Sequence, residues 1–392
     1  MDAHARAHAF YEEGLTGVRA LAACWVMLYH VNAFAGPRVL SVNVLGNDVH
    51  LHPLITIGWL GVTIFFVLSG FLLTTHLLSS IERGDERLLP RYFMARVRRV
   101  IPAYWAQIAI LFVVALAVHR AVPDWLRYVP QHLFMLQNTS EFEASLINGV
   151  YWTLPIEFAF YFVLPAIAVR LAARDAMPDA RMYRLLAYLY LASVAIGIGW
   201  RVAVYPLGGP NVAWISNQLP GTLDQFVLGT VVAAGLRRWR KAHPDAQVAA
   251  ASNALTLLGL AGIVTLMYYL DAIHATFWAG RHNAVYWWYS ANALCVALLV
   301  LGVALGGGVS RALFANQVSV AIGTISYSLY LWHLPIVLWL QPVNLPYATF
   351  FAVAIALTLA ASALSYWLVE RPFLRSAPRQ SGRSRSDPPL PS

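Results

Sequence analysis

The sequence predicts an all-α membrane protein with about ten transmembrane helices in one bundle. Of its 392 residues, 59% are hydrophobic and only 11% are charged, whereas soluble domains carry roughly 25% charged residues. The mean hydropathy is +0.59. Apolar stretches long enough to cross a bilayer recur along the chain. We expect spans at 15–36, 53–79, 100–119, 150–172, 185–205, 220–236, 252–272, 284–305, 317–341 and 347–370.

The basic residues predict that both termini are cytoplasmic. With the N-terminus inside, all but five of the 27 lysines and arginines fall on the inner side of these spans; the five are Arg38, Arg120, Arg127, Arg201 and Arg281. This bias follows the positive-inside rule, which also accounts for the net charge of +9. Membrane lipids are therefore the expected partners of the basic residues, and nucleic acid is not.

Composition also indicates the location and the domain boundaries. The excess of arginine over lysine and the richness in alanine are typical of a GC-rich bacterial genome, which favours a multi-pass protein of the bacterial cytoplasmic (inner) membrane. Residues 1–375 form one predicted transmembrane domain. Residues 376–392 are rich in Pro, Ser and Arg and are expected to form a disordered cytoplasmic tail.

Arg19 and His30 are the most informative polar residues within a span. They are eleven residues apart, which is close to three helical turns, so they share a face at an axial distance of about 16 Å. An ionisable group at membrane depth costs about 2.5 kcal/mol or more and usually marks a functional site. We interpret Arg19 as a phosphate-binding cation near one membrane surface and His30 as a base deeper in the bilayer. The alternative is a snorkelling arginine and a structural histidine.

A run of arginines precedes and enters the third span. Arg96 and Arg99 share a helical face, and Arg98 lies about 100° from Arg99. Guanidinium groups bind phosphate oxygens in pairs, so the run indicates an anion site. The alternative is a topology signal that binds anionic lipid headgroups.

Glu157 lies several residues inside an apolar span. Such a carboxylate must be protonated, paired with a cation or bound to substrate hydroxyls. It is predicted to orient His30 or to balance its charge, as a carboxylate does in a catalytic triad. A structural ion pair between helices is the alternative.

Other polar positions carry weaker signals. For Asp224 and His333, structure and function are equally open. Structure is favoured for Ser69, where a small residue lets helices approach closely, and for Glu370-Arg371-Pro372, where proline is expected to end the last span. No Walker A motif, dinucleotide glycine fingerprint or zinc motif is present in the sequence, and no metal is expected.

Six motifs in order resemble the acyltransferase-3 family of integral-membrane O-acyltransferases. The resemblance runs nearly end to end, with two departures, Thr63 where the family usually has Asp and Ala95 where it usually has Arg. The motifs are Arg19 to His30, Gly58 to Phe71, Arg96 to Pro102, Trp152 to Tyr161, Ser326 to His333 and Glu370 to Pro372.

The resemblance implies transfer of an acyl group, often acetyl, from acyl-coenzyme A to a hydroxyl. The acceptor would be a glycan, a glycolipid or a macrolide-type small molecule. The implied roles are catalysis by His30 and Glu157, binding of the coenzyme A phosphates by Arg19, Arg96, Arg98 and Arg99, and substrate binding by Trp152, Tyr161, Asp224 and His333.

Two questions stay open at this point. Transfer could be direct or could pass through an acyl-histidine. The competing function is a proton-coupled secondary transporter or exporter, since intramembrane His, Glu and Arg also form proton relays. Such a carrier does not need the arginine run. A lipid-binding structural protein is the third possibility.

Overall fold

The computed structural model describes residues 3–36, 40–44, 47–119, 124–139, 147–207, 212–244, 246–275 and 283–375. The all-α expectation is confirmed. Within these residues, nine helices are long and apolar enough to cross a membrane, and a bent helix pair makes a tenth span. The tail predicted at 376–392 lies outside the described residues.

Sixteen α-helices and one β-hairpin make up the described part of the chain. The long helices are α1 (Ala3–Ala35), α3 (Gly61–Glu82), α4 (Leu88–His119), α6 (Thr153–Ala172), α7 (Asp179–Val204), α9 (Leu219–Ala242), α10 (Ala249–Ala272), α11 (Trp288–Leu305), α14 (Ser326–Leu340) and α15 (Tyr347–Ser365). The short helices are α2 (Pro53–Thr56), α5 (Val129–Leu133), α8 (Val212–Ser216), α12 (Gly308–Phe314), α13 (Gln317–Thr324) and α16 (Arg371–Arg375). The antiparallel hairpin pairs β1 (Ser41–Val44) with β2 (Asn47–His50), Ser41 facing His50.

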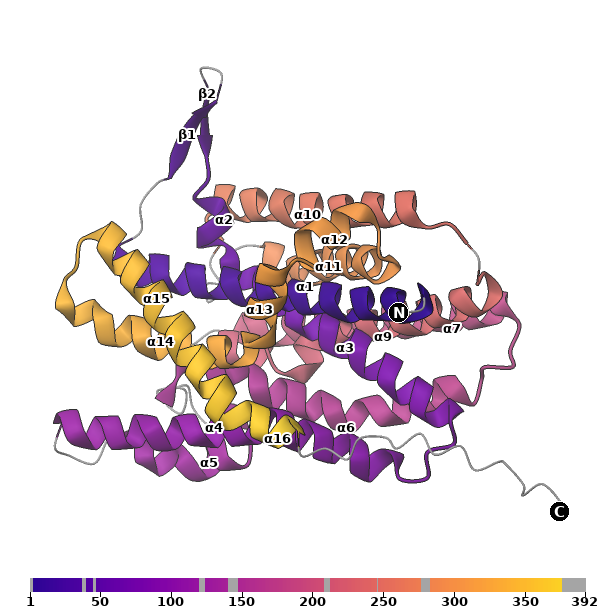
Figure 1. Cartoon of the computed structure of the whole chain (residues 1–392), viewed down its shortest axis with the longest axis horizontal. Coiled ribbons are helices and arrows are strands. Elements are labelled where there is room, and N and C mark those ends of the chain that lie inside the picture. The colour runs from indigo at the N-terminus through magenta and orange to yellow at the C-terminus, as the bar shows by residue number, and fades with distance from the viewer. Residues whose placement is uncertain are drawn as a thin grey trace, which may run out of the picture.

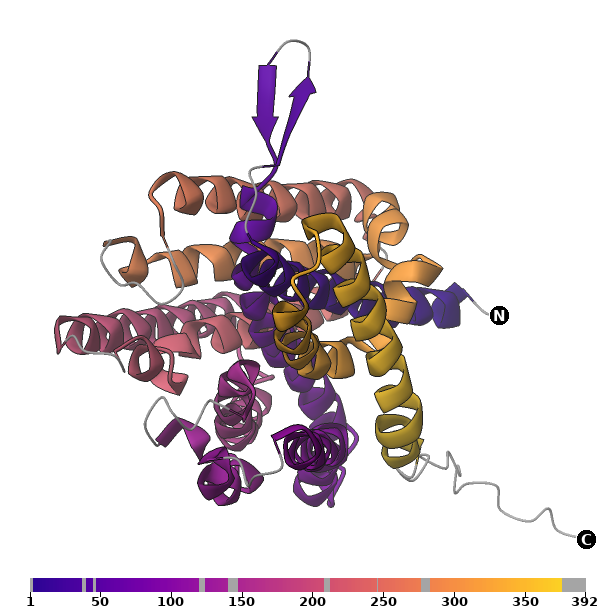
Figure 2. The ribbon, with the colours of Figure 1, turned by 90° about the vertical axis from the view of Figure 1, so that its left-hand side faces the viewer.

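Helix α3 lies at the centre of the bundle. In its most apolar window 72% of the residues are buried, against 22% in α7 and α15, which lie at the periphery. Helices α10 and α4 lie at opposite edges, and the hairpin projects away from the helices (Figures 1 and 2). We call the end where α3 and α9 finish the basic end and the end where they begin the hairpin end.

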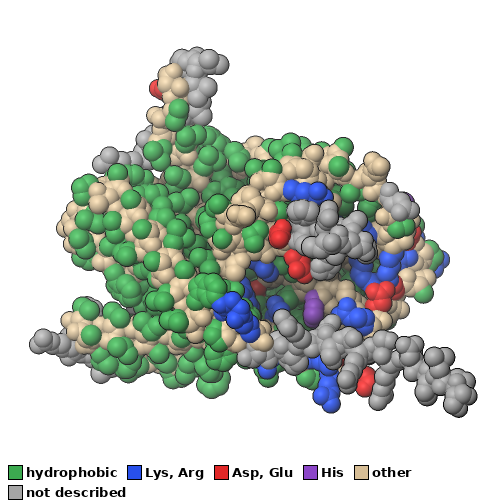
Figure 3. Space-filling model, in the orientation of Figure 1, with side chains coloured by type: hydrophobic (Ala, Val, Ile, Leu, Met, Phe, Trp, Pro, Cys, Tyr) green, Lys and Arg blue, Asp and Glu red, His purple; other side chains and the backbone are tan. Residues whose placement is uncertain are grey.

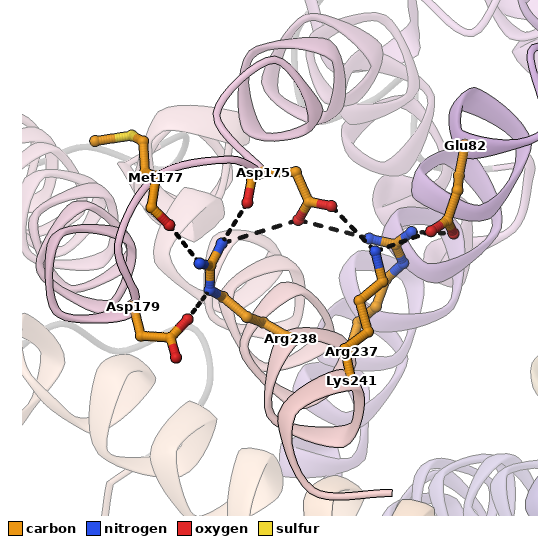
Figure 4. Close-up of polar contacts among 7 residues, drawn as sticks. All are labelled: Glu82, Asp175, Met177, Asp179, Arg237, Arg238 and Lys241. Carbon is orange, nitrogen blue, oxygen red and sulfur yellow. Dashed lines mark hydrogen bonds and ion pairs between the residues drawn. The ribbon is translucent and has the colours of Figure 1, made fainter.

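Charged side chains gather at the basic end. In Figure 3 most of the visible surface is hydrophobic, and Lys, Arg, Asp and Glu cluster on the right-hand side around a hollow. Figure 4 shows how this end is tied together: Arg237 and Lys241 of α9 contact Glu82 of α3 and Asp175 of the α6–α7 connection. Arg238 binds Asp179 at the start of α7. The network therefore fastens three helices and a loop at one end of the bundle.

Two elements depart from regular helices beside the centre. The ninth span is broken, because α13 and α14 meet at an angle of 70° near Ile325. The last span contains a π-helical turn at Tyr366–Glu370 before α16. Proline at position 372 does not end the span as expected, since the helix continues to Arg375. In membrane proteins and elsewhere, broken helices and π-turns occur preferentially at functional sites.

Helix α4 is longer than the sequence suggested. It begins at Leu88, so the arginine run expected to lie ahead of the third span forms its third and fourth turns. At about 1.5 Å per residue, Arg96 and Arg99 lie about 12 and 16 Å from its first residue. These two arginines are therefore carried into the bundle by the helix itself.

Helices α3 and α9 approach each other through a pair of glycines. A Cβ atom on Gly229 would lie 2.0 Å from the carbonyl oxygen of Val67, and one on Gly70 would lie 2.0 Å from that of Phe226. Small residues at such contacts let membrane helices pack backbone to backbone.

The close contact predicts that Gly229→Ala destabilises the protein by about 1–3 kcal/mol or more, because the backbones must separate. Gly199→Ala is the matched control, since its Cβ atom would meet nothing within 4 Å. The midpoint of thermal unfolding in detergent measures both. Equal midpoints for the two variants would contradict the contact.

Candidate active site

Three arginines line a cavity of about 110 Å³ inside the bundle. Arg19 comes from α1, and Arg96 and Arg99 come from the shared face of α4. Glu157 and Tyr161 of α6 line the same cavity, which we call the arginine cavity. Arg98 is not among its lining residues. The cavity therefore joins five of the residues that the sequence singled out, from three helices far apart in the chain.

The three arginines differ in their partners. Arg99 Nη1 donates to Glu370 Oε2 at 3.1 Å, and Glu370 also accepts a hydrogen bond from Ser328. The Glu370 side chain is 1% exposed. By contrast, Arg96 Nε is buried and has no hydrogen-bond partner among the described residues. An orphaned guanidinium N–H in a cavity is a donor available to a bound anion.

Glu157 receives a hydrogen bond from Ser69 of α3, which also lines the arginine cavity. The sequence favoured a packing role for Ser69 and a contact between Glu157 and His30. In the structure, Glu157 instead lies among Arg19, Arg96 and Tyr161. Glu157 therefore shares a cavity with the arginines, whose positive charge it is placed to balance.

His30 lines a second, smaller cavity of about 40 Å³ on the hairpin side. Its other lining residues include Tyr29, Trp59, Gly149 and Trp152, and we call it the histidine cavity. Val62 and Tyr330 line both cavities and separate them. Tyr330 is fixed in place, since its hydroxyl donates to the carbonyl oxygen of Val150 at 2.8 Å and lies 3.0 Å from Thr153 Oγ1.

His333 of α14 lies against His30. The distance from His333 Nε2 to His30 Nδ1 is 3.2 Å, and the ring centroids are 5.0 Å apart. His333 is completely buried. The bend between α13 and α14 brings α14 into the interior, where eleven of its residues are buried.

Asp224 lies in a different part of the bundle. Its carboxylate is 3.8 Å from Arg201 Nη2, and both side chains are fully buried. Ser290 of α11 donates a hydrogen bond to Asp224, and the guanidinium of Arg201 lies 4.6 Å from the ring centre of Tyr289. Asp224 lines neither the arginine cavity nor the histidine cavity. Its partners make it part of an ion pair between helices α7 and α9.

Sequence reasoning missed the contributions of three residues, Ser69, Tyr330 and Glu370. Each of the three stands in one of the six motifs. Ser69 and Tyr330 are ordinary residue types at their positions. Glu370 is an unusual one, but its carboxylate at the end of a span was interpreted as a boundary signal. Its burial and its pairing with Arg99 become visible only when the π-turn turns it toward α4.

The Arg99–Glu370 pair predicts that Glu370→Gln lowers the free energy of unfolding by about 1.5–3 kcal/mol, because Arg99, which is 25% exposed, loses a hydrogen bond to a charged partner. Glu82→Gln is the control, since Glu82 is 53% exposed in its pair with Arg237, and exposed pairs contribute about 0–1 kcal/mol. Thermal unfolding in detergent compares the two. A double variant, Arg99→Met with Glu370→Met, should recover most of the loss; no recovery would show that the ion pair is not the cause.

Comparisons with known proteins agree with this arrangement of motifs. The model of the acyltransferase-3 family, described as an acyltransferase domain, matches residues 12–369. O-acetyltransferase OatA of Staphylococcus aureus strain NCTC 8325 is 26% identical over 383 residues, covering 92% of this chain and 57% of the relative. A protein of S. aureus strain MSSA476, named as an unproven O-acetyltransferase, is 25% identical over 388 residues, covering 93% and 57%.

The chain thus spans 57% of the length of these curated relatives. No solved structure matches it. The family match extends over nearly the whole chain and includes all of the residues that line the two cavities. The chain belongs to the acyltransferase-3 family.

Proposed function

We propose that this protein is a membrane O-acyltransferase that moves an acyl group, most simply acetyl, from acyl-coenzyme A to a hydroxyl group. The observation that carries the proposal is the arginine cavity, in which Arg96 Nε has no partner among the described residues. A proton-coupled carrier has no use for a cluster of guanidinium groups beside the histidine. The names of the relatives favour acetyl as the acyl group.

Arg19, Arg96 and Arg99 bind the phosphates of coenzyme A in this proposal. Guanidinium forks match phosphate oxygens, and the low dielectric of the bundle strengthens the contact. Arg98, which does not line the cavity, acts at its entrance. Glu157 accepts a hydrogen bond from Ser69 and offsets part of the positive charge of the arginines before the donor arrives.

The acyl group then reaches His30. Arg19 and His30 are eleven residues apart on α1, or about 16 Å along its axis. The pantetheine arm is a long unbranched chain, and it would run past Val62 and Tyr330, which border both cavities. Side-chain motion at this border is required to open the path.

In the transfer step, His30 removes the proton from the acceptor hydroxyl. The acceptor oxygen attacks the thioester carbonyl, an oxygen–carbon bond forms and the carbon–sulfur bond breaks. The coenzyme A thiolate takes up the proton from the His30 imidazolium. Atoms and charge balance without a metal ion, so no cofactor other than the donor is required by this route.

The acceptor enters at the histidine cavity. Tyr29, Trp59 and Trp152 line it, and aromatic rings suit the faces of a sugar or the apolar side of a macrolide. We propose a carbohydrate or small-molecule hydroxyl as the acceptor. Tyr161 contacts the donor, whereas Asp224 supports the bundle through Arg201.

We further propose the bacterial cytoplasmic membrane as the location, with both termini cytoplasmic. The clustering of Arg237, Arg238 and Lys241 at the basic end supports this orientation. The arginine cavity would then open toward cytoplasmic acyl-coenzyme A, and the histidine cavity toward the outer face.

His30→Gln is expected to lower the turnover number about 10²–10⁴-fold, because the general base is lost. The assay is acceptor-dependent release of coenzyme A from acetyl-coenzyme A by the purified protein in nanodiscs, with a panel of glycan and macrolide acceptors. Binding of acetyl-coenzyme A should be unchanged. Full activity of the variant would refute His30 as the base.

Arg96→Ala is expected to raise the KM for acetyl-coenzyme A about tenfold or more, since a charged hydrogen bond contributes about 1.5–3 kcal/mol. The turnover number should change less than the KM. Arg184→Ala is the control, because Arg184 is exposed on α7 and, among the described residues, its side chain hydrogen-bonds only to Ala180 of its own helix. If both variants bind the donor like the wild type, the arginine cavity is not the donor site.

A further inference from the structure

His30 and His333 form a directed hydrogen-bond chain that begins and ends on backbone carbonyls. His30 Nδ1 lies 2.9 Å from the carbonyl oxygen of Val26 and 3.2 Å from His333 Nε2. His333 Nδ1 lies 3.1 Å from the carbonyl oxygen of Leu329. Each histidine thus contacts the carbonyl one turn earlier in its own helix, and the two rings also contact each other.

The two backbone carbonyls determine which ring nitrogen of each histidine carries the hydrogen. A carbonyl oxygen only accepts, so each Nδ1 must carry the hydrogen. In a neutral histidine the other nitrogen then holds an electron pair. His333 Nε2 is therefore an acceptor, and His30 Nδ1–H is shared between Val26 and His333. The opposite assignment would place two electron pairs against each other at 3.1 Å beside Leu329.

This assignment has one consequence for His30. Its Nε2 keeps the electron pair, and no hydrogen bond from the described residues reaches that atom. The ring borders the histidine cavity and is held edge-on by Tyr29, at a centroid distance of 4.8 Å. A base needs this arrangement, with its basic nitrogen open to the substrate and its other nitrogen fixed.

We propose that His333 is a positioning residue that accepts a second hydrogen bond from His30 Nδ1–H, beside the one to Val26, and so holds the ring with its Nε2 presented as the base. This proposal rests on the proposed function for its catalytic part. Here a neutral histidine takes the position that a carboxylate holds in a serine-protease triad. When His30 accepts the acceptor's proton at Nε2, Nδ1–H remains bound to Val26 and His333, and no proton passes to His333.

The role explains why α14 is bent into the bundle. The break at Ile325 brings α14 inward, and Tyr330 and His333 are one turn apart on it. Tyr330 borders both cavities, and its ring centroid is 5.8 Å from that of His333. One helix therefore sets both the border between the cavities and the orientation of the base.

Two variants separate positioning from mere packing. His333→Leu removes the second acceptor for Nδ1–H and leaves only the Val26 carbonyl, whereas His333→Gln supplies a side-chain oxygen that can accept. We expect His333→Leu to lower the turnover number at least about tenfold with little change in the KM for acetyl-coenzyme A, and His333→Gln to restore most of it. Trp339→Phe is the control, because Trp339 is on the same helix and 45% exposed.

A second readout needs no activity. Nitrogen-15 NMR of histidine-labelled protein distinguishes a protonated Nδ1 from a protonated Nε2, and the His30 signal is assigned by its absence in His30→Gln. We expect Nδ1–H at His30 in the wild type, the same signal in His333→Gln, and a shifted Nδ1–H signal in His333→Leu, where Val26 alone accepts the hydrogen bond. If the NMR spectra are as expected but no acceptor leads to release of coenzyme A from acetyl-coenzyme A, the proposed function fails while the positioning geometry stands.

Three results would overturn the positioning role. One is a wild-type His30 that carries its proton on Nε2. Another is a His333→Leu protein that folds and keeps both the wild-type turnover number and the wild-type His30 signal. The third is equal loss of turnover in folded His333→Leu and His333→Gln, because a lost packing contact would not be rescued by an oxygen atom.

Discussion

Charge inside an apolar bundle is the constraint on which this structure depends. Each arginine in the membrane must find a partner or bind a ligand, since an unpaired ion costs several kcal/mol there. Arg99 pairs with Glu370, which is distant in the chain, and Arg201 pairs with Asp224 of the next long helix. Arg96 keeps one buried donor without a partner among the described residues. Arg201 Nε and Nη2 also have no hydrogen-bond partner among the described residues, but Arg96, unlike Arg201, lines the arginine cavity that we propose as the anion site.

Departures from regular helix geometry place two of the interacting side chains, Glu370 and His333. The π-turn at Tyr366–Glu370 widens the last span and aims Glu370 at α4. The bend between α13 and α14 places His333 beside His30. Both distortions free backbone groups, which is tolerated only where neighbouring side chains or cavities satisfy them. The bend lies next to a helix that borders both cavities through Tyr330, and the π-turn reaches the arginine cavity through the pairing of Glu370 with Arg99.

Period and composition were sufficient to predict the spans and the face shared by Arg96 and Arg99, because both depend on local geometry alone. They were not sufficient to predict which side chains would contact each other. Glu157 was expected beside His30, yet its hydrogen bond comes from Ser69, and His30 is bound to a second histidine. Which carboxylate meets which cation depends on how helices cross, and a residue such as Glu370 at a span end gives no sign of the bend that buries it.

In the proposed function the arginine cavity takes the donor and the histidine cavity takes the acceptor, and their separation has a chemical reason. A thioester exposed to water and to a base would be hydrolysed, so the base and the phosphate anchors must be apart until the acyl arm is in place. Val62 and Tyr330 form that border, and Tyr330 is anchored by Val150 and Thr153. Thr153 and Glu157 are one turn apart on α6, and Glu157 lines the donor cavity. In the proposed function, α6 therefore connects the donor site to the border residue Tyr330, through Glu157 and Thr153.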